Sequence, residues 1–226
     1  MTSPFERTAE LIGKSNFAKL VSADILVVGL GGVGGAALEV LARSGIGRFT
    51  VADGDAFEPT NLNRQLLCTR DEIGKSKADA AKRRVLSVNP QAVVTTVNEF
   101  ITSDNVDKTV DRRFTYCVDA IDDIESKVAL IAECKRKNIP IVSAMGAGNR
   151  TQCDFAVADV FSTKDDPLAR KLRRLLRKAG VTELDVVCGI SPPAIKRGAP
   201  LSIAAPPIVM GAMLANRVIN KILDTE

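Results

Sequence analysis

The sequence predicts a doubly wound α/β fold, with a mostly parallel sheet and helices on both faces. Short apolar runs rich in β-branched residues alternate with longer segments of helical periodicity over the first two thirds of the chain. A glycine-rich turn, GLGGVG, directly follows the first of these runs. Strands that alternate with helices favour right-handed crossovers, which place parallel strands side by side and helices over them.

The predicted strands are short and apolar, as expected for strands that are buried on both faces of a parallel sheet. The first, residues 24–28, continues as an apolar run after its initial aspartate and is too short for a helix. The other predicted strands are residues 48–52, 92–98, 116–120, 139–144 and 155–160.

The helices are predicted from apolar periodicity and from the residues that stop it. Residues 36–44 continue the glycine turn until Gly45 and Gly47, and residues 75–88 end at Asn89 and Pro90. The other predicted helices are residues 8–20, 105–111, 125–137, 167–179 and 208–223. Because the last of them is apolar on one side, we expect it to pack in the core or against another subunit.

Length and composition are those of an ordinary soluble domain. The 226 residues include 46% hydrophobic and 26% charged residues, and no repeat or low-complexity tract divides them, so we expect a single domain over residues 1–226. No basic-then-apolar leader begins the sequence, and every apolar run is interrupted well before ~20 residues. We therefore expect a soluble cytoplasmic protein with no membrane partner.

The inventory of reactive side chains excludes several kinds of chemistry. Histidine is absent, which removes histidine-based triads and most zinc sites. The five cysteines form no C-x-x-C pair, so neither a zinc knuckle nor a disulfide framework is predicted. Catalysis must then rely on Arg, Lys, Asp, Cys or backbone donors.

The glycine turn predicts a nucleotide site of Rossmann-like type. Gly29, Gly31 and Gly34 fit the G-x-G-x-x-G pattern between a strand and a helix, where backbone N–H groups approach phosphate closely. Asp53 ends the second strand, where a carboxylate meets a ribose hydroxyl. This pattern alone leaves three alternatives open: NAD, ATP, or tight packing without a ligand.

The residues after the second strand favour a triphosphate. Asp55 leads into the string Asn61-Leu62-Asn63-Arg64-Gln65, and Lys77 opens the next predicted helix. Cations at these positions neutralise phosphate oxygens and stabilise the charge that develops on leaving pyrophosphate. A nicotinamide needs instead a flat, mostly apolar slot.

Three acidic residues, Asp119, Asp122 and Asp123, follow the fourth predicted strand. The carboxyl ends of the strands form the edge where open α/β sheets bind ligands, and a carboxylate there can hold Mg²⁺ against phosphate oxygens. Asp123 has a second interpretation, because an aspartate at that position also caps the helix that follows it.

Taken together, these segments resemble the adenylating superfamily of the ubiquitin-activating enzymes and the bacterial ThiF and MoeB proteins. The resemblance covers roughly the first 130 residues. The matched elements, in order, are Arg7, the Gly-x-Gly-Gly-Val-Gly turn, Asp53 with Asp55, the Asn-Leu-Asn-Arg-Gln string, residues 74–77 and residues 119–123.

The resemblance implies a role for each matched residue and a homodimeric ThiF-type domain. It implies that Arg7, Arg64, Lys77 and Asp122 are catalytic, with Asp122 binding Mg²⁺ and Arg7 reaching the ATP of the other subunit. It implies that ATP is bound by Gly29, Gly31, Gly32, Gly34, Asp53, Asp55, Asn61, Arg64, Gln65 and Lys77. The implied reaction is the adenylation of a carboxylate, with loss of pyrophosphate.

Several longer strings are similar to the tRNA threonylcarbamoyladenosine dehydratases, among them LARSGIGRFTVADGD and VADVFSTKDDPLARKLRRLLRK. That resemblance implies ATP-dependent cyclisation of the threonylcarbamoyl group in tRNA, through an adenylated carboxylate that the group's own nitrogen attacks. The alternative is adenylation of the carboxy terminus of a ubiquitin-like or sulfur-carrier protein, although the paired C-x-x-C motifs common in that branch are absent. A scaffold with a relic nucleotide site and a dehydrogenase are more distant alternatives.

Residues 170–178 become a candidate tRNA surface under this resemblance. On a helix the leucines of this segment face inward, and the six cations spread over the exposed side, where they suit phosphates. Those cations are Arg170, Lys171, Arg173, Arg174, Arg177 and Lys178. Before the resemblance is considered, a merely solvated helix face is the better interpretation, because the net charge of +4 is modest.

Cys188 is the candidate thiol. It aligns with a cysteine of the dehydratase branch, and a thiolate is a competent acyl acceptor. Cyclisation does not require a thioester, however, and the apolar neighbours of Cys188 favour a buried structural residue. The sequence also departs from the branch here, since Ser191-Pro192-Pro193 stands in place of Ser-Thr-Glu and residues 194–205 form a shorter loop.

Overall fold

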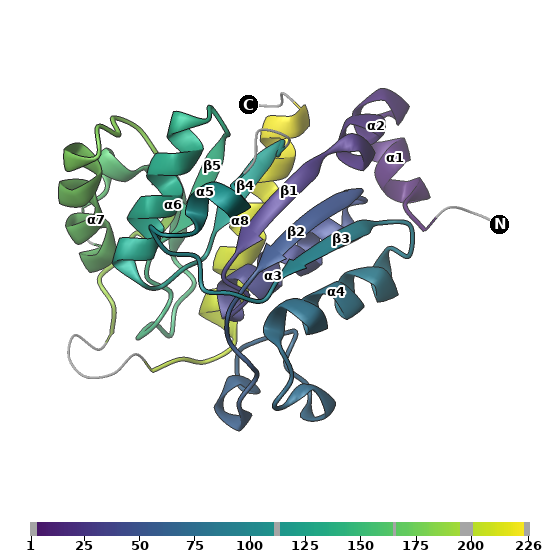
Figure 1. The fold of residues 1–226 in the computed structure, drawn as a ribbon, viewed down its shortest axis with the longest axis horizontal. Helices are drawn as coiled ribbons and strands as arrows, with labels where there is room; N and C mark the ends of the chain where they lie inside the picture. Colours follow the sequence, from purple (N-terminus) through teal and green to yellow (C-terminus); the bar gives the residue numbers. More distant parts are fainter. Residues whose placement is uncertain (1–3, 111–113, 165, 195–200, 224–226) are drawn as a thin grey trace.

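The computed structural model describes residues 4–110, 114–164, 166–194 and 201–223. Its strands form one seven-stranded sheet in the order β3-β2-β1-β4-β5-β7-β6. All neighbours are parallel except β6 and β7, which pair antiparallel at one edge. The predicted doubly wound, mostly parallel sheet is therefore confirmed (Figure 1). The strands are Asp24–Val28 (β1), Arg48–Ala52 (β2), Val93–Val97 (β3), Tyr116–Asp119 (β4), Ile141–Ala144 (β5), Phe155–Asp159 (β6) and Asp185–Gly189 (β7).

Helices cover both faces of this sheet. The α-helices are Glu6–Ile12 (α1), Lys14–Ser22 (α2), Gly32–Arg43 (α3), Lys77–Val88 (α4), Val106–Thr109 (α5), Ile124–Arg136 (α6), Pro167–Lys178 (α7) and Ala205–Leu223 (α8). Short 3-10 turns are found at Pro59–Asn61 (η1), Arg70–Glu72 (η2) and Val160–Ser162 (η3). No helix in these described ranges is long and apolar enough to cross a membrane.

Two hydrophobic cores follow from the alternation of side chains along each strand. In β1, Ile25 and Val27 belong to the core under α3, α4 and α8, and Leu26 and Val28 belong to the core under α6 and α7. All five residues of β1 are buried, which explains why the four residues after Asp24 are all apolar. The buried residues of α8 confirm its expected packing in the core.

The structure corrects three of the predicted elements. Residues 8–20 do not form one helix, because Gly13 adopts a left-handed φ of 83° and separates α1 from α2. The helix predicted at residues 36–44 begins earlier, at Gly32. Strand β7 was not predicted at all.

Other predicted elements differ from the structure only at their ends. The helix expected at residues 105–111 is the single turn α5, and residue 111 lies outside the described residues. The loop at 194–205 is described only in part, because residues 195–200 lie outside it. The organisation of residues 1–226 as one domain stays a prediction.

Candidate nucleotide site

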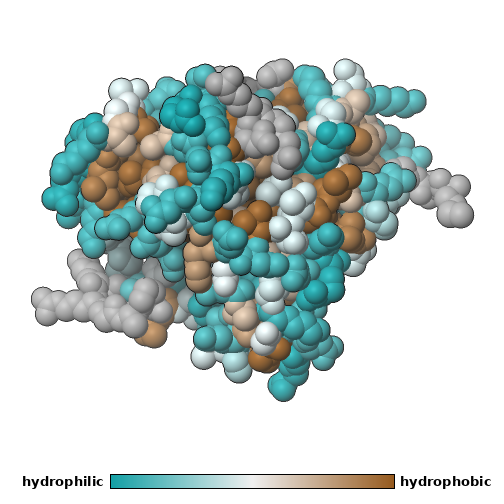
Figure 2. Space-filling view, in the orientation of Figure 1, coloured by the Kyte–Doolittle hydropathy of each residue, from teal (hydrophilic) through white to brown (hydrophobic). Residues whose placement is uncertain are grey.

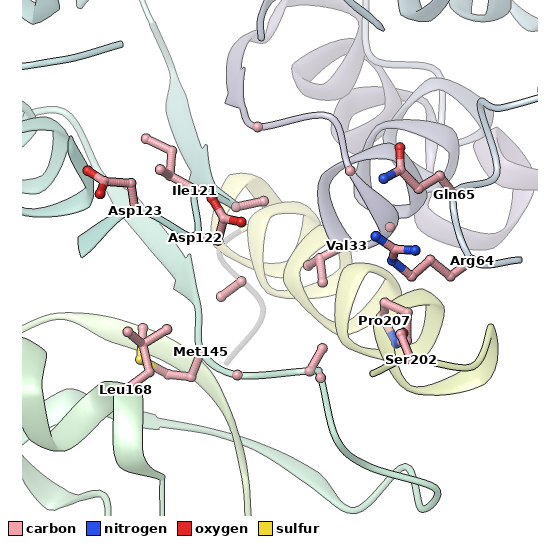
Figure 3. Close-up of a pocket in the computed structure, with 18 of the residues that line it drawn as sticks. Val33, Arg64, Gln65, Ile121, Asp122, Asp123, Met145, Leu168, Ser202 and Pro207 are labelled. Carbon is pink, nitrogen blue, oxygen red and sulfur yellow. The ribbon is translucent and has the colours of Figure 1, made fainter. Parts of the chain in front are cut away.

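A large cavity lies at the carboxyl ends of the central parallel strands. Its volume is about 1290 Å³, and its lining comes from the turns after β1, β2, β4 and β5 and from the starts of α7 and α8. In Figure 3, Arg64 and Gln65 border one side of this cavity, and Ile121 and Asp122 border the opposite side. This is the edge at which open α/β sheets bind ligands, as the sequence predicted.

The glycine turn forms the floor of the cavity beside α3. Gly29 has a φ of 85°, and a side chain there would meet the Ala120 carbonyl oxygen at 2.6 Å. A Cβ atom on Gly34 would lie only 1.8 Å from the Gly29 carbonyl oxygen, so strand and helix pack too closely for any side chain. Gly31 and Gly32 line the cavity at the amino terminus of α3, where backbone N–H groups lack helical partners.

Asp53 holds this turn in place. Its Oδ2 accepts a hydrogen bond from the Leu30 N–H at 2.6 Å, and its Oδ1 accepts one from the Asp55 N–H at 2.9 Å. Each carboxylate oxygen has a second lone pair, so a ribose hydroxyl can still donate to Asp53. Asp53 thus positions the phosphate turn as well as offering an acceptor.

The predicted cations lie in the cavity, each with a defined support. The Lys77 side chain is buried, and its Nζ lies 2.8 Å from Asp55 Oδ2. Arg64 Nη1 donates to the Thr60 carbonyl and to Asn63 Oδ1, both at 3.0 Å. In Figure 3 the guanidinium of Arg64 extends into the cavity. These contacts pre-orient positive charge where a triphosphate would place its oxygens.

The two amides of the Asn61 to Gln65 string have different roles. Asn61 Oδ1 accepts a hydrogen bond from the Glu58 N–H at 3.1 Å and so fixes the turn η1. Gln65 is 6% exposed, and its Oε1 is buried without a hydrogen-bond partner among the described residues. Both line the cavity, and the buried Oε1 of Gln65 is left for a ligand there.

The three acids after β4 are not equivalent. Asp119 is fully buried and pairs with Lys127 Nζ at 2.7 Å. Asp123 caps α6 by accepting the Ser126 N–H at 2.8 Å, and that backbone hydrogen bond lowers the pKa of its carboxyl. Asp122 is exposed, lines the cavity, and has no hydrogen bond or ion pair to any other described residue. In Figure 3 its carboxylate extends into the cavity, whereas Asp123 points away.

Asp122 and the cavity fit the way in which Mg²⁺ binds beside phosphates. No three His, Cys, Asp or Glu side chains in the described ranges converge on a common point. An all-protein metal cage is therefore not built there. Mg²⁺ usually takes one or two carboxylates together with substrate phosphates and water, so the unpaired carboxylate of Asp122 is a suitable ligand.

The predicted catalytic residue Arg7 does not lie in this cavity. It is an exposed residue of α1, and it is not among the residues that line the cavity. Figure 1 shows α1 and α2 at the other end of β1, away from the glycine turn. Arg7 therefore cannot contact a nucleotide bound to its own chain in this arrangement.

The six cations of α7 have four kinds of surroundings. Arg170 and Lys171 line the mouth of the cavity, and Arg174 and Lys178 are exposed further along the helix. Arg173 is half-buried and donates to the Thr163 carbonyl at 2.6 Å. Arg177 lies over the ring of Phe161, 5.2 Å from its centre. Figure 2 shows hydrophilic side chains along the left margin of the molecule, over α7.

Cys188 belongs to a hydrophobic core. It lies on β7, is 6% exposed, and is not among the residues that line the cavity. Burial raises the pKa of its thiol, and the nearby Asp166 raises it further, while Arg150 lowers it. A thiol with a raised pKa is a poor nucleophile at neutral pH, so its environment favours the structural interpretation.

Several residues of the cavity were not predicted from the sequence. Pro207, at the start of α8, packs against Gly32, where an added Cβ would meet Pro207 Cβ at 3.0 Å. Arg150 and Asp166 lie on the side of β5 and α7, and Phe100 is an exposed aromatic of the lining. The sequence signals only the capping position of Asp166, an aspartate before Pro167 at the start of a predicted helix.

Known proteins share this fold and much of the sequence. The profile of the ThiF family matches residues 5–226. The tRNA threonylcarbamoyladenosine dehydratase of Escherichia coli (strain K12) is 43% identical over 174 residues, which are 76% of this chain and 65% of that protein. The aligned part is thus slightly less than two thirds of the length of this relative.

Solved structures extend the similarity to nearly the whole chain. The E. coli tRNA N6-threonylcarbamoyladenosine dehydratase TcdA, solved with AMP, superimposes with a TM-score of 0.93 at 35% identity. The match covers 98% of this chain and 94% of that one. The same enzyme solved with ATP gives a TM-score of 0.91 at 35% identity, with the same coverage. With its profile matched from residue 5 to the last residue, the chain belongs to the ThiF family.

Proposed function

We propose that this protein is an ATP-dependent tRNA threonylcarbamoyladenosine dehydratase, which cyclises the threonylcarbamoyl group through an adenylated carboxylate. The observation that supports it most is the cavity itself. The glycine turn, Arg64 and Lys77 line one side of this cavity, an acid without a partner among the described residues faces them, and two cations of α7 also line it. Relatives named as such dehydratases, including one solved with ATP, share the fold and the sequence.

In the first half-reaction the substrate carboxylate attacks the α-phosphate of ATP, and pyrophosphate leaves. The free N–H groups at the start of α3, together with Arg64 and Lys77, would contact the phosphates, and Asp53 would accept a ribose hydroxyl. These groups act by position and charge rather than by proton transfer. They suit a chain that contains no histidine.

Mg²⁺ would be held by Asp122 and phosphate oxygens, and it would neutralise the charge that builds up on the phosphates. Without a bound Mg²⁺ ion, Asp122 would repel the triphosphate, because its carboxylate has no compensating cation among the described residues. The chain's own contribution is the placement of one unpaired carboxylate opposite Arg64.

A homodimer would give Arg7 its role. Since Arg7 is far from the cavity of its own chain, we propose that it reaches the ATP bound to the partner subunit. The exposed position of α1 leaves Arg7 accessible for that contact. A mixture of an Arg7→Ala chain with an Asp122→Asn chain would then recover activity in mixed dimers that contain one intact site.

The tRNA would lie along α7. Arg170, Lys171, Arg174 and Lys178 are exposed and carry no hydrogen bond to the described part of the chain, so they are available for phosphates. Arg173 instead holds η3 to α7. We also propose a cytoplasmic location, because it would suit a tRNA substrate and it fits the five free cysteines.

The decisive experiment supplies ATP, Mg²⁺ and tRNA that carries threonylcarbamoyladenosine. We expect AMP and pyrophosphate to form, and the modified nucleoside to lose the mass of one water. Unmodified tRNA is the control and should give neither product. If pyrophosphate exchange were stimulated instead by a small carrier protein with a free carboxy terminus, the adenylation of that carrier would replace this proposal.

A further inference from the structure

Asp166 holds a buried oxygen that no described neighbour satisfies. The residue is 1% exposed and caps α7, with Oδ1 accepting the N–H groups of Leu168 at 2.9 Å and Ala169 at 3.0 Å. Its Oδ2 is buried and has no hydrogen-bond partner in the described part of the chain. An unsatisfied buried acceptor destabilises the fold, and more so when it is charged, so a retained one points to a ligand.

A guanidinium stands near this oxygen without bonding to it. Arg150 Nη2 lies 4.0 Å from Oδ2, too far for a hydrogen bond but close enough to compensate the charge. The Arg150 guanidinium is fixed by its hydrogen bonds to the carbonyls of Gly146 at 3.0 Å and Ser191 at 2.6 Å. Gly189 makes room for it, because a Cβ atom there would lie 2.0 Å from the guanidinium.

Asp166 belongs to the half of the cavity that lies away from the glycine turn. Both Asp166 and Gly146 line the cavity, and Oδ2 lies 3.9 Å from the position of a Cβ atom on Gly146. In Figure 3, Met145 and Leu168 mark this half, across the cavity from Gln65. The cavity volume of about 1290 Å³ exceeds the usual upper range of about 1,000 Å³ for a single small ligand. A second reactant therefore has room beside ATP.

The proposed reaction needs a proton acceptor, and we expect it in the half of the cavity that lies away from the glycine turn. When the urea nitrogen of the threonylcarbamoyl group attacks the acyl adenylate, the nitrogen must lose its proton. The other carboxylates of the lining already have partners. Asp53 accepts a backbone N–H, and Asp55 pairs with Lys77. Glu58 and Asp123 cap η1 and α6, and Glu99 accepts a hydrogen bond from Asn105. Asp122 lies across the cavity from Arg64, on the side of the predicted Mg²⁺ site.

We propose that Asp166 is a catalytic residue that accepts this proton, an inference that rests on the proposed dehydratase function. The nitrogen forms a bond to the acyl carbon, and the bond between that carbon and the phosphate oxygen of AMP breaks. AMP leaves with the bonding electron pair, and the proton of the nitrogen passes to Asp166 Oδ2 and afterwards to water. Because adenylation needs no proton acceptor, Asp166 serves only the second step.

The two steps can be measured separately with modified tRNA, ATP and Mg²⁺. Pyrophosphate release in the first turnover reports adenylation, and loss of one water from the nucleoside reports cyclisation. In Asp166→Asn the capping oxygen remains and an amide replaces the free acceptor. We expect adenylation within about twofold of the wild-type rate, and cyclisation slower by about 10²- to 10⁴-fold, the usual contribution of a positioned acid or base.

Two further variants separate catalysis from structure. Asp166→Ser keeps a cap for α7 and leaves space for a small anion, so added formate should restore part of its cyclisation rate. Asp123→Asn is the matched control, because Asp123 is also a cap, and it should cyclise at the wild-type rate. Formate should not accelerate either the control or the wild type.

Each outcome decides the proposal. If Asp166→Asn cyclises within about threefold of wild type, or if adenylation and cyclisation fall equally and formate rescues neither, Asp166 is only a helix cap. If the wild-type protein fails to adenylate modified tRNA, the dehydratase function fails first, and the role of Asp166 falls with it. These results are distinguishable because pyrophosphate and nucleoside mass are recorded in the same samples.

Discussion

Lys127 Nζ lies 2.7 Å from Asp119 Oδ2, and both side chains are completely buried beneath the turn between β4 and α6. The other oxygen of Asp119 accepts the Ile121 N–H at 3.1 Å. The ion pair therefore fixes the backbone immediately before Asp122. A charge pair that looks purely structural thus determines where the proposed metal ligand stands.

Lys127→Met should lower the free energy of unfolding by about 3–5 kcal/mol, because it leaves the Asp119 carboxylate buried without its partner. The double variant Asp119→Asn with Lys127→Met should lose less than Lys127→Met alone. Urea unfolding of the two variants and the wild type measures both quantities. A double variant less stable than the single one would contradict this account of the pair.

Asp122→Asn should abolish ATP turnover while leaving the fold intact. The exposed carboxylate has no structural partner among the described residues. The free energy of unfolding should therefore change by less than about 0.5 kcal/mol. Turnover of ATP with modified tRNA, titrated with Mg²⁺, gives the measurement. Asp123→Asn serves as the control, because Asp123 is occupied as the cap of α6 and an asparagine retains the cap. Normal turnover in Asp122→Asn would refute its assignment to Mg²⁺.

Gly34→Ala and Gly31→Ala should differ sharply. The new Cβ atom lies 1.8 Å from the Gly29 carbonyl oxygen in Gly34→Ala, whereas in Gly31→Ala its nearest neighbour is Gln65 Nε2 at 3.8 Å. We expect Gly34→Ala to lose more than about 3 kcal/mol of stability or to remain unfolded, as overpacking against backbone has no relief. Gly31→Ala should unfold near the wild-type temperature and bind ATP more weakly. Circular dichroism melts and ATP titration distinguish the two.

Cys188→Ser should keep cyclisation activity, because the thiol is buried outside the cavity and its pKa is raised. Alkylation with iodoacetamide should reach Cys153, the exposed cysteine, well before Cys188. Peptide mass spectrometry over time provides the order. Activity lost in a folded Cys188→Ser variant, together with a thioester trapped on the wild type, would establish the thiol as an intermediate.

Tyr116 should make stability depend on alkaline pH. Burial, with a smaller effect of Asp185, raises the pKa of this phenol to about 12, above about 10 in an unfolded chain. The unfolded state loses the proton first, so the free energy of unfolding falls between about pH 10 and 12, by about 3 kcal/mol at most. Tyr116 is the only tyrosine and the chain has no tryptophan, so tyrosinate absorbance follows it directly. Tyr116→Phe should remove this part of the pH dependence, and an equal slope in both proteins would contradict it.

The strands that carry the site could be predicted because they are buried and their sequences are therefore short apolar runs. Strands β1 and β2 have the predicted bounds, since every residue of β1 and all but the first of β2 are buried. The break at Gly13 and the strand β7 were harder. Apolar spacing continues across Gly13, and the apolar part of β7 is only Val186 to Cys188, which is shorter than a usual strand signal.

The sequence could also predict which residues meet on the glycine-turn side of the cavity, since they follow strand ends and glycines in fixed order. The opposite half could not be predicted. The local sequence of Asp166 predicts only a helix cap. Nothing in it shows that one carboxylate oxygen has no partner among the described residues. The neighbour Arg150 is brought to it by tertiary folding alone, through carbonyl groups of Gly146 and Ser191 that any residue type would supply.

The contact of Pro207 with Gly32 joins the first and last thirds of the chain at the phosphate turn. During synthesis the glycine turn emerges from the ribosome long before α8 does, and it lacks this wall until the helix has docked. A chain truncated before Ala205 would therefore retain every residue of the predicted nucleotide motif. It would lack the wall of the cavity that Pro207 forms. The cavity is therefore completed only late in folding, when α8 has packed against the rest of the chain.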